Sequence, residues 1–237
     1  MRRIILTITA LYFCSAVFAQ HKWFSLYIDS TRLVNDANEI GSLFIADINK
    51  IKPGINFHPP IILHTTPWLI YYDGKVNLPL WEQVIPELKS FTYNVSGGEK
   101  NGKKLFGLFF NGFYLPHELG HGFQDKTGKN GLSGSYDNEY FANTVATLWW
   151  RKHNKQKELK QCYRLVKKVL KHYSNPVPPG VDIRKYYTDN YQKILADKEN
   201  FAQVYGYMQF MQFIKIYEDK SLPGFDDFIK NFLNKQQ

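Results

Sequence analysis

Two histidines, His117 and His121, lie four residues apart in the segment PHELGH at 116–121. Residues four apart on a helix share one face, so both imidazoles can reach a single cation. Glu118 lies one position further round the helix, where it can take a proton from a water molecule beside that cation. Pro116 suits a first helical turn, where its missing N–H is not needed. The pattern predicts a metal-binding helix with an adjacent general base; the alternative is a helical face that two histidines merely cap or fill.

A catalytic zinc site normally takes three protein ligands and one water molecule, so a third ligand is required. Glu139 lies eighteen residues after His121, at the start of a predicted helix that follows the Gly-, Asn- and Ser-rich loop 125–137. Two antiparallel helices would bring Glu139 opposite the histidines. Asn143, one turn beyond Glu139, points the same way and is expected to orient one histidine through a hydrogen bond. Asp137 is the alternative third ligand.

The segments HELGH at 117–121 and NEYFAN at 138–143 resemble those of the gluzincins, the thermolysin-like zinc metallopeptidases, and especially the small members of that clan. The resemblance implies a zincin-like fold, one Zn²⁺ per chain and hydrolysis of peptide bonds in a peptide or protein substrate. It also implies the roles of four residues: the zinc ligands His117, His121 and Glu139, and the general base Glu118.

The resemblance covers only part of the chain and leaves three points open. Gluzincins often have an aspartate where this chain has Asn143, which accepts a hydrogen bond without adding charge. In this clan a tyrosine or histidine from a later helix often donates to the oxyanion. Tyr205 and Tyr207 are candidates because Gly206 between them would let another backbone or a substrate approach; the alternative is that both belong to the core. The strand predicted at 76–80 is a candidate for adding a peptide as an extra strand.

The elements around these residues predict an α+β protein, with a small N-terminal sheet, flanking helices and a mostly helical C-terminal lobe. The segment 97–104 reads as a polar loop, and 105–115 is ambiguous between a strand and a buried helix. Pro79 suits an edge strand, because proline cannot donate to a ladder. Strands are expected at 61–66, 68–72 and 76–80, and helices at about 30–50, 81–93, 116–126, 138–153, 156–173, 183–195, 198–218 and 223–234.

Residues 1–19 have the layout of a secretory signal peptide: a basic start, an apolar run, and small residues before a cleavage site at Gln20. The alternative is an uncleaved anchor, but the apolar run is short for a hydrocarbon core of about 30 Å. We therefore expect an exported protein, periplasmic or extracellular, without stable membrane insertion after cleavage. Residues 20–237 are expected to form a single domain.

The chain has a net charge of +9, and its lysines and arginines concentrate at 151–171 along one face of a predicted helix. A solvated helix face explains them, and an exported protein has little occasion to bind nucleic acid. Cys162 lies in the apolar stripe of that helix and is expected to be buried. Two alternatives to an active peptidase remain: an inactive zincin-fold binding protein, and a basic protein that binds anionic lipid or glycan surfaces.

Overall fold

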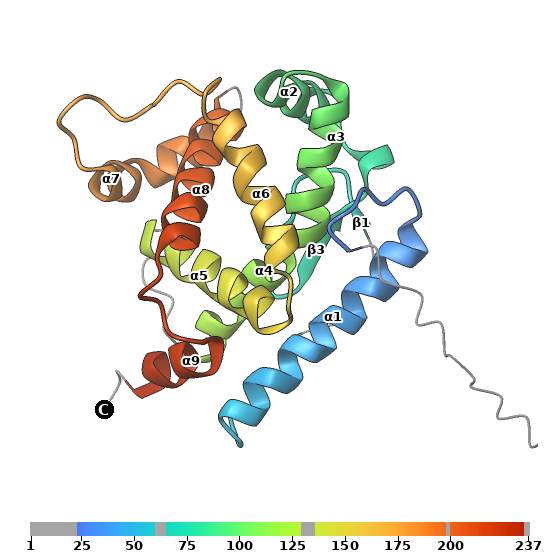
Figure 1. Cartoon of the computed structure of the whole chain (residues 1–237), viewed down its shortest axis with the longest axis vertical. Coiled ribbons are helices and arrows are strands. Elements are labelled where there is room, and N and C mark those ends of the chain that lie inside the picture. The colour runs from blue at the N-terminus through green and yellow to red at the C-terminus, as the bar shows by residue number, and fades with distance from the viewer. Residues whose placement is uncertain (1–22, 60–64, 129–135, 198–199, 235–237) are drawn as a thin grey trace, which may run out of the picture.

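The computed structural model describes residues 23–59, 65–128, 136–197 and 200–234 (Figure 1). The predicted signal peptide and most of the strand predicted at 61–66 lie outside the described residues. The described part is mostly helical and contains a small sheet, which confirms the α+β prediction at this level. No helix in the described ranges has the length and apolar character needed to cross a membrane.

Nine α-helices are present in the described residues, and most begin or end within a few residues of the predicted positions. The first is capped by Asp29, whose side chain accepts a hydrogen bond from the Arg32 backbone N–H at 2.6 Å. The helices are α1 (Ser30–Ile51), α2 (Pro86–Ser96), α3 (Glu99–Leu108), α4 (Tyr114–Lys126), α5 (Tyr136–Lys152), α6 (Gln156–Val169), α7 (Ile183–Ala196), α8 (Phe201–Glu218) and α9 (Phe225–Asn234), with a short 3₁₀ turn at Trp81–Gln83.

The described strands are β1 (Thr65–Thr66), β2 (Tyr71–Tyr72) and β3 (Val76–Pro79), and they form a sheet in the order β1-β3-β2. β3 pairs parallel to β1 and antiparallel to β2. The prediction that the strand at 76–80 lies at an edge, open to an added peptide, is therefore wrong. Pro79 is tolerated at the end of this central strand. Its carbonyl accepts a hydrogen bond from Asn111 Nδ2 at 2.9 Å, which ties the sheet to the helical layer.

The segment 97–104 is not the loop that its polar composition predicts, because α3 begins at Glu99. Gly97 and Gly98 adopt positive φ values of 78° and 121°, so the chain reverses at these glycines before the helix starts. The polar residues that follow face solvent, whereas Leu105 and Phe106 are buried. Burial of these apolar side chains, rather than local propensity, accounts for the helix. The segment 105–115, which the sequence left open between a strand and a buried helix, is helical as well.

A π-helical turn at Phe109–Phe113 joins α3 to α4, so Pro116 lies inside a nearly continuous helical segment. Because proline has no N–H, Pro116 cannot donate to the carbonyl of Gly112 four residues earlier. The indole Nε1–H of Trp23 donates to that carbonyl instead, at 3.0 Å. The segment beginning at Trp23 therefore satisfies a backbone group that the proline leaves without a partner.

Aromatic residues make up 16% of the chain, and many of their side chains fill the core between the helices. Phe109 and Phe113 pack edge-to-face on Phe213 of α8, with ring centroids 5.4 and 5.0 Å apart. α4 packs against α1 and α5, and α5 packs against α8, so α4 is enclosed between elements distant in sequence (Figure 1). Cys162 on α6 is fully buried, as predicted from its place in the apolar stripe.

Candidate metal centre

α4 and α5 lie against each other and run in opposite directions. Near the end of α4, Gln124 Nε2 donates to Asn138 Oδ1 near the start of α5, at 3.3 Å. Just before α4, the carbonyl of Phe113 accepts from Trp150 Nε1 near the end of α5, at 3.3 Å. This antiparallel pairing is the arrangement expected from the Gly- and Asn-rich connection, and it brings Glu139 opposite the two histidines.

Three donor atoms from these helices form a nearly equilateral triangle. The Nε2 atoms of His117 and His121 are 3.2 Å apart. The Oε2 atom of Glu139 lies 3.3 Å from His117 Nε2 and 3.5 Å from His121 Nε2. Ligand atoms about 2.0 Å from a tetrahedral ion lie about 3.3 Å from one another. The triangle therefore has the dimensions of one face of a zinc coordination tetrahedron.

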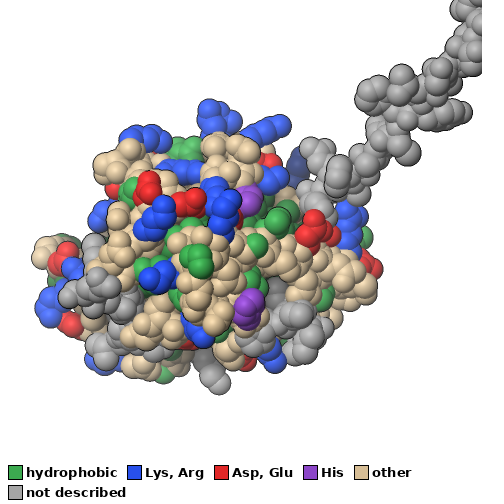
Figure 2. Space-filling model, turned by 90° about the horizontal axis from the view of Figure 1, so that it is seen from below, with side chains coloured by type: hydrophobic (Ala, Val, Ile, Leu, Met, Phe, Trp, Pro, Cys, Tyr) green, Lys and Arg blue, Asp and Glu red, His purple; other side chains and the backbone are tan. Residues whose placement is uncertain are grey.

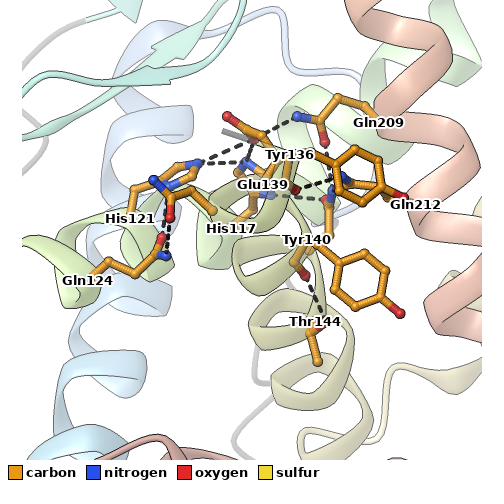
Figure 3. A network of polar contacts seen from close by, with 11 residues as sticks. His117, His121, Gln124, Tyr136, Glu139, Tyr140, Thr144, Gln209 and Gln212 are labelled. Carbon is orange, nitrogen blue, oxygen red and sulfur yellow. Dashed lines mark hydrogen bonds and ion pairs between the residues drawn. The ribbon is translucent and has the colours of Figure 1, made fainter. Parts of the chain in front are cut away.

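Hydrogen bonds to side-chain amide oxygens orient both imidazoles (Figure 3). Asn143 Oδ1 lies 3.0 Å from His117 Nδ1, and Gln124 Oε1 lies 3.1 Å from His121 Nδ1. An amide oxygen can only accept a hydrogen bond, so each Nδ1 carries a proton, and each Nε2 is the ring nitrogen that can bind an ion at the shared centre once its own proton has left. Hydrogen bonds to the second ring nitrogen orient metal-ligating histidines in the same way.

A continuous set of amides links these residues to α8 (Figure 3). Asn143 Nδ2 donates to Gln209 Oε1 at 2.7 Å and to Gln212 Oε1 at 2.9 Å. Gln209 Nε2 then donates to Glu139 Oε2 at 2.7 Å, and Gln212 Nε2 donates to the carbonyl of Tyr136 at 2.9 Å. Each buried amide group in this set has a partner, so the set fixes the relative positions of α4, α5 and α8.

The site is buried and strongly polar. Burial alone would raise the pKa of Glu139, but the positive charge of His121 and hydrogen bonds from both histidines hold that pKa well below its usual range. Burial would lower the pKa of His121, yet the carboxylates of Glu139 and Glu118 raise it to about 9. The local field therefore favours a cation at the centre of the triangle.

Glu118 is adjacent to the histidines without belonging to the triangle. A carboxylate oxygen of Glu118 and one ring nitrogen of each histidine all lie within 4.8 Å of one another. The side chain is buried, with the residue 7% exposed. Burial raises the pKa of Glu118, Glu139 raises it further, and the histidines oppose both effects. A carboxylate with a raised pKa is a stronger base than a free carboxylate, which suits it to accept and return a proton.

No protein-family model, no curated protein and no solved structure matches this chain.

The other residues singled out in the sequence separate into those at the site and those away from it. Tyr205 lines the same cleft as the triangle, and burial and the charge of Glu139 raise its pKa well above its ordinary value. Tyr207, two residues on, packs against Tyr173 with ring centroids 6.1 Å apart and does not line the cleft. The carboxylate of Asp137 pairs with Arg184 on the exposed side of α5, away from the histidines.

The triangle forms part of the floor of an open cleft of about 340 Å³. The cleft is also lined by the segment 68–74, which contains β2, by Tyr191 and Leu195 of α7, and by Tyr205 of α8. Three large apolar residues of this lining are well exposed: Trp68, Tyr71 and Leu195. Exposed apolar side chains gathered around a polar centre are typical of a ligand-binding mouth.

Sequence reasoning missed the amides of Gln124, Gln209 and Gln212. A signal for them exists. Gln124 lies three residues after His121, on the same helical face. Gln209 and Gln212 interrupt the otherwise apolar run MQFMQF and are also three apart. Polar residues repeated at helical spacing inside an apolar helix indicate a buried polar contact, although the sequence alone does not identify the partner.

Proposed function

We propose that this protein is an exported zinc metallopeptidase with a zincin-like fold, in which His117, His121 and Glu139 hold one Zn²⁺ and Glu118 is the general base. The observation that carries the proposal is the triangle of donor atoms with sides of 3.2, 3.3 and 3.5 Å. Two imidazole nitrogens and one carboxylate oxygen are also a donor set used by catalytic zinc sites, which leave a fourth position open.

The proposed reaction is hydrolysis of a peptide bond. Bound zinc would polarise the carbonyl of the scissile bond and activate the attacking water. Glu118 accepts a proton from that water and passes it to the leaving nitrogen, so the same carboxylate acts first as base and then as acid. Tyr205, beside Glu139 in the cleft, is the candidate donor to the negatively charged oxygen that develops on the carbonyl.

The cleft supports an extended peptide as the substrate. Among the described strands, β2 lies at an edge of the sheet, because only β3 pairs with it. Both residues of β2, Tyr71 and Tyr72, line the cleft. The free side of an edge strand offers backbone donors and acceptors to an extended chain. The exposed rings of Trp68 and Tyr71 add apolar contacts beside it. β2 therefore replaces β3 as the proposed pairing strand.

The zinc content of the purified mature protein, wild type beside Glu139→Ala, tests the metal site. We expect about one zinc per wild-type chain and a marked loss in the variant, because removing one of three ligands opens the site. Glu87→Ala, which removes an exposed glutamate from α2, is the matched control and should retain the metal. Wild-type protein that holds no zinc after reconstitution would exclude the proposal.

Cleavage of a diverse peptide library tests turnover. Glu118→Ala should retain zinc and lose cleavage, since Glu118 is proposed to move a proton and not to hold the ion. Identical products from wild type and Glu118→Ala would exclude catalysis at this site. A protein that binds zinc and peptides without cleaving them would be a zincin-fold binding protein.

Binding to anionic surfaces has weaker support. Lysine and arginine side chains occur at separate places over the face seen in Figure 2, with acidic side chains among them. Several basic residues of α5 to α7 are also paired, as in Lys152 with Asp47 and Arg184 with Asp137. A charge pattern of this kind is typical of a solvated surface.

A further inference from the structure

The cleft around the metal centre is acidic, although the chain as a whole has a net charge of +9. Apart from the two histidines, the charged side chains among its described lining residues are all carboxylates: Asp73, Glu118, Asp125 and Glu139. No lysine or arginine occurs among these described lining residues. The charge of the cleft is thus opposite to that of the protein, which favours a positively charged ligand there.

Two of these carboxylates, Glu118 and Glu139, lie at the metal centre and are buried. Glu118 is 7% exposed, lines the cleft and makes no hydrogen bond within the described residues, so its carboxylate faces the space that a ligand enters. Together the two carboxylates offset the two positive charges that a bound Zn²⁺ would bring. The charge that remains in the cleft then comes from Asp73 and Asp125.

Tyr72 of β2 brings these two aspartates to one side of the cleft. A Cβ atom added to Gly122 would lie 3.1 Å from two ring carbons of Tyr72, so the ring packs directly on α4. Asp73 follows Tyr72 in the chain, and Asp125 lies three residues after Gly122. Burial raises the pKa of Tyr72, and the charges of Asp125 and Asp73 raise it further. Both carboxylates therefore lie close enough to the Tyr72 hydroxyl to act on one cation together.

Both aspartates are available to a ligand. Asn77, which is buried, donates from Nδ2 to Asp73 Oδ1 at 2.8 Å, so this carboxylate is oriented while its second oxygen remains free to accept. Neither Asp73 nor Asp125 forms an ion pair with a described lysine or arginine. Lys75 and Lys126, close to them in the sequence, do not line the cleft. Both aspartates are exposed, so a substrate can reach them.

We propose that Asp73 and Asp125 form a subsite for a lysine or arginine side chain of the substrate, one or two residues from the bond that is cut. This inference rests on the proposed peptidase function. Asp125 lies four residues after His121, one turn of about 5.4 Å further along the same helical face. A peptide extended along β2 advances about 3.3 Å per residue, so a residue one or two positions from the scissile bond comes level with Asp125. The exposed ring of Tyr71 offers a surface for the apolar stem of a long basic side chain.

Peptides that carry arginine or citrulline at each position in turn test the preference, because citrulline keeps the shape of arginine without its charge. At one position, wild type should cleave the arginine peptide with a kcat/KM about three- to tenfold higher, the effect of two exposed ion pairs. Asp73→Asn combined with Asp125→Asn should bring this ratio close to one, whereas Asp227→Asn, exposed on α9, should leave it unchanged. The ratio should also fall as the salt concentration rises. Equal ratios in wild type and the double variant would overturn the inference.

Binding without cleavage separates this inference from the proposed function. The probes are acetyl-Ala-Arg-Ala-amide and its citrulline counterpart, and their affinities for Glu118→Gln incubated with zinc are measured by NMR titration. The arginine probe should bind more tightly, and adding Asp73→Asn and Asp125→Asn should remove the difference. Cleavage by wild type without any preference for arginine would overturn the inference and keep the peptidase. Binding that prefers arginine, in a wild-type protein that cleaves no peptide, would overturn the proposed function and keep the subsite. A protein that neither cleaves nor binds these peptides would overturn both.

Discussion

Gln209 Nε2 on α8 donates a 2.7 Å hydrogen bond to Glu139 Oε2, the same oxygen that lies 3.3 Å from His117 Nε2. The proposed third ligand is thus oriented by a residue seventy positions later in the chain. A carboxylate oxygen has a lone pair for Gln209 and another for an ion, so the hydrogen bond orients Glu139 without occupying the site.

Gln209→Leu should weaken zinc binding by about 10–100-fold, the usual effect of removing a partner of a metal ligand. The substitution removes the donor to Glu139 and the acceptor of Asn143, which frees the carboxylate to rotate. Affinity is measured by competition with a chelator, and circular dichroism checks that the variant folds. Gln203→Leu, at an exposed position of the same helix, is the control. A folded Gln209→Leu protein with wild-type affinity would show that the hydrogen bond does not orient the ligand.

Asn143→Asp should destabilise the protein, although gluzincins often have an aspartate at this place. Asn143 Nδ2 donates to the Oε1 atoms of Gln209 and Gln212, and a carboxylate would leave both oxygens without a donor. Gln209 cannot turn its amide round without losing its bond to Glu139. The expected loss is about 1–3 kcal/mol in the free energy of unfolding, measured by urea titration.

The control for this substitution is Asn231→Asp, at an exposed position of α9. It makes the same chemical change and should alter the unfolding free energy by less than about 0.5 kcal/mol. An Asn143→Asp protein as stable as wild type would mean that the glutamines rearrange freely, and that α8 does not fix the network.

Asp47 on α1 accepts hydrogen bonds from three side chains of α5 and the turn after it. Trp149 Nε1 lies 2.9 Å away, and Lys152 Nζ and His153 Nε2 are each 2.7 Å away. Burial would raise the pKa of Asp47, but these bonds and the charge of Lys152 lower it. A carboxylate whose pKa is lowered on folding stabilises the protein at pH values above its unfolded-state pKa of about 3.9. This stabilisation is lost as the pH falls through the folded-state pKa.

Asp47→Asn should therefore cost about 1–2 kcal/mol of unfolding free energy at pH 7, a range reduced for the partial exposure of Lys152. The difference from wild type should shrink as the pH falls below about 4. Urea unfolding at several pH values measures it, with Asp227→Asn, exposed on α9, as the control. A difference that stays constant down to pH 2 would contradict the assigned role of the carboxylate charge.

Gly107→Ala and Gly41→Ala should change stability in opposite directions, although both glycines lie in helices. An added Cβ at Gly107 would lie 2.5 Å from the backbone nitrogen of Leu26 and 2.7 Å from the carbonyl carbon of Ser25. The backbone must shift, which costs about 1–3 kcal/mol and outweighs the helix propensity gained. At Gly41 the nearest atom is 4.0 Å away, so alanine should stabilise by up to about 1 kcal/mol.

Thermal or urea unfolding of Gly107→Ala and Gly41→Ala, each compared with wild type, measures the two expected changes in stability. The loss in Gly107→Ala is expected to loosen the segment after Trp23, whose indole donates a hydrogen bond to the carbonyl of Gly112 just before α4. Equal stabilisation of both variants would mean that this segment does not pack closely on α3.

Several parts of the fold were predictable because their signals are local. Asp29 caps α1 as its side chain and position indicate, and the apolar stripe of α6 with Cys162 is buried as its spacing indicates. The segment 97–104 was mispredicted as a loop because it contains three glycines and Asn101, residue types with low helix propensity. Burial of Leu105 and Phe106 against other elements determines that helix.

The candidate site shows the same division. The spacing of His117 and His121, and the position of Glu118 beside them, follow from helix geometry and are readable in the sequence. The antiparallel return that brings Glu139 opposite them was also expected from the short connection. The two sides of the donor triangle that end at Glu139 were not readable, because they depend on how far apart α4 and α5 pack.

The sequence by itself determined most of the helices and the shared face of His117 and His121 with Glu118 beside it, because helix geometry repeats every few residues and records which side chains share a face. Only the tertiary structure decided that β3 lies between two of the described strands and that the glutamines of α8 hold Glu139 and Asn143. Each of these depends on contacts between residues far apart in the chain. Such contacts are selected by burial and hydrogen-bond satisfaction over the whole molecule, which no local pattern records.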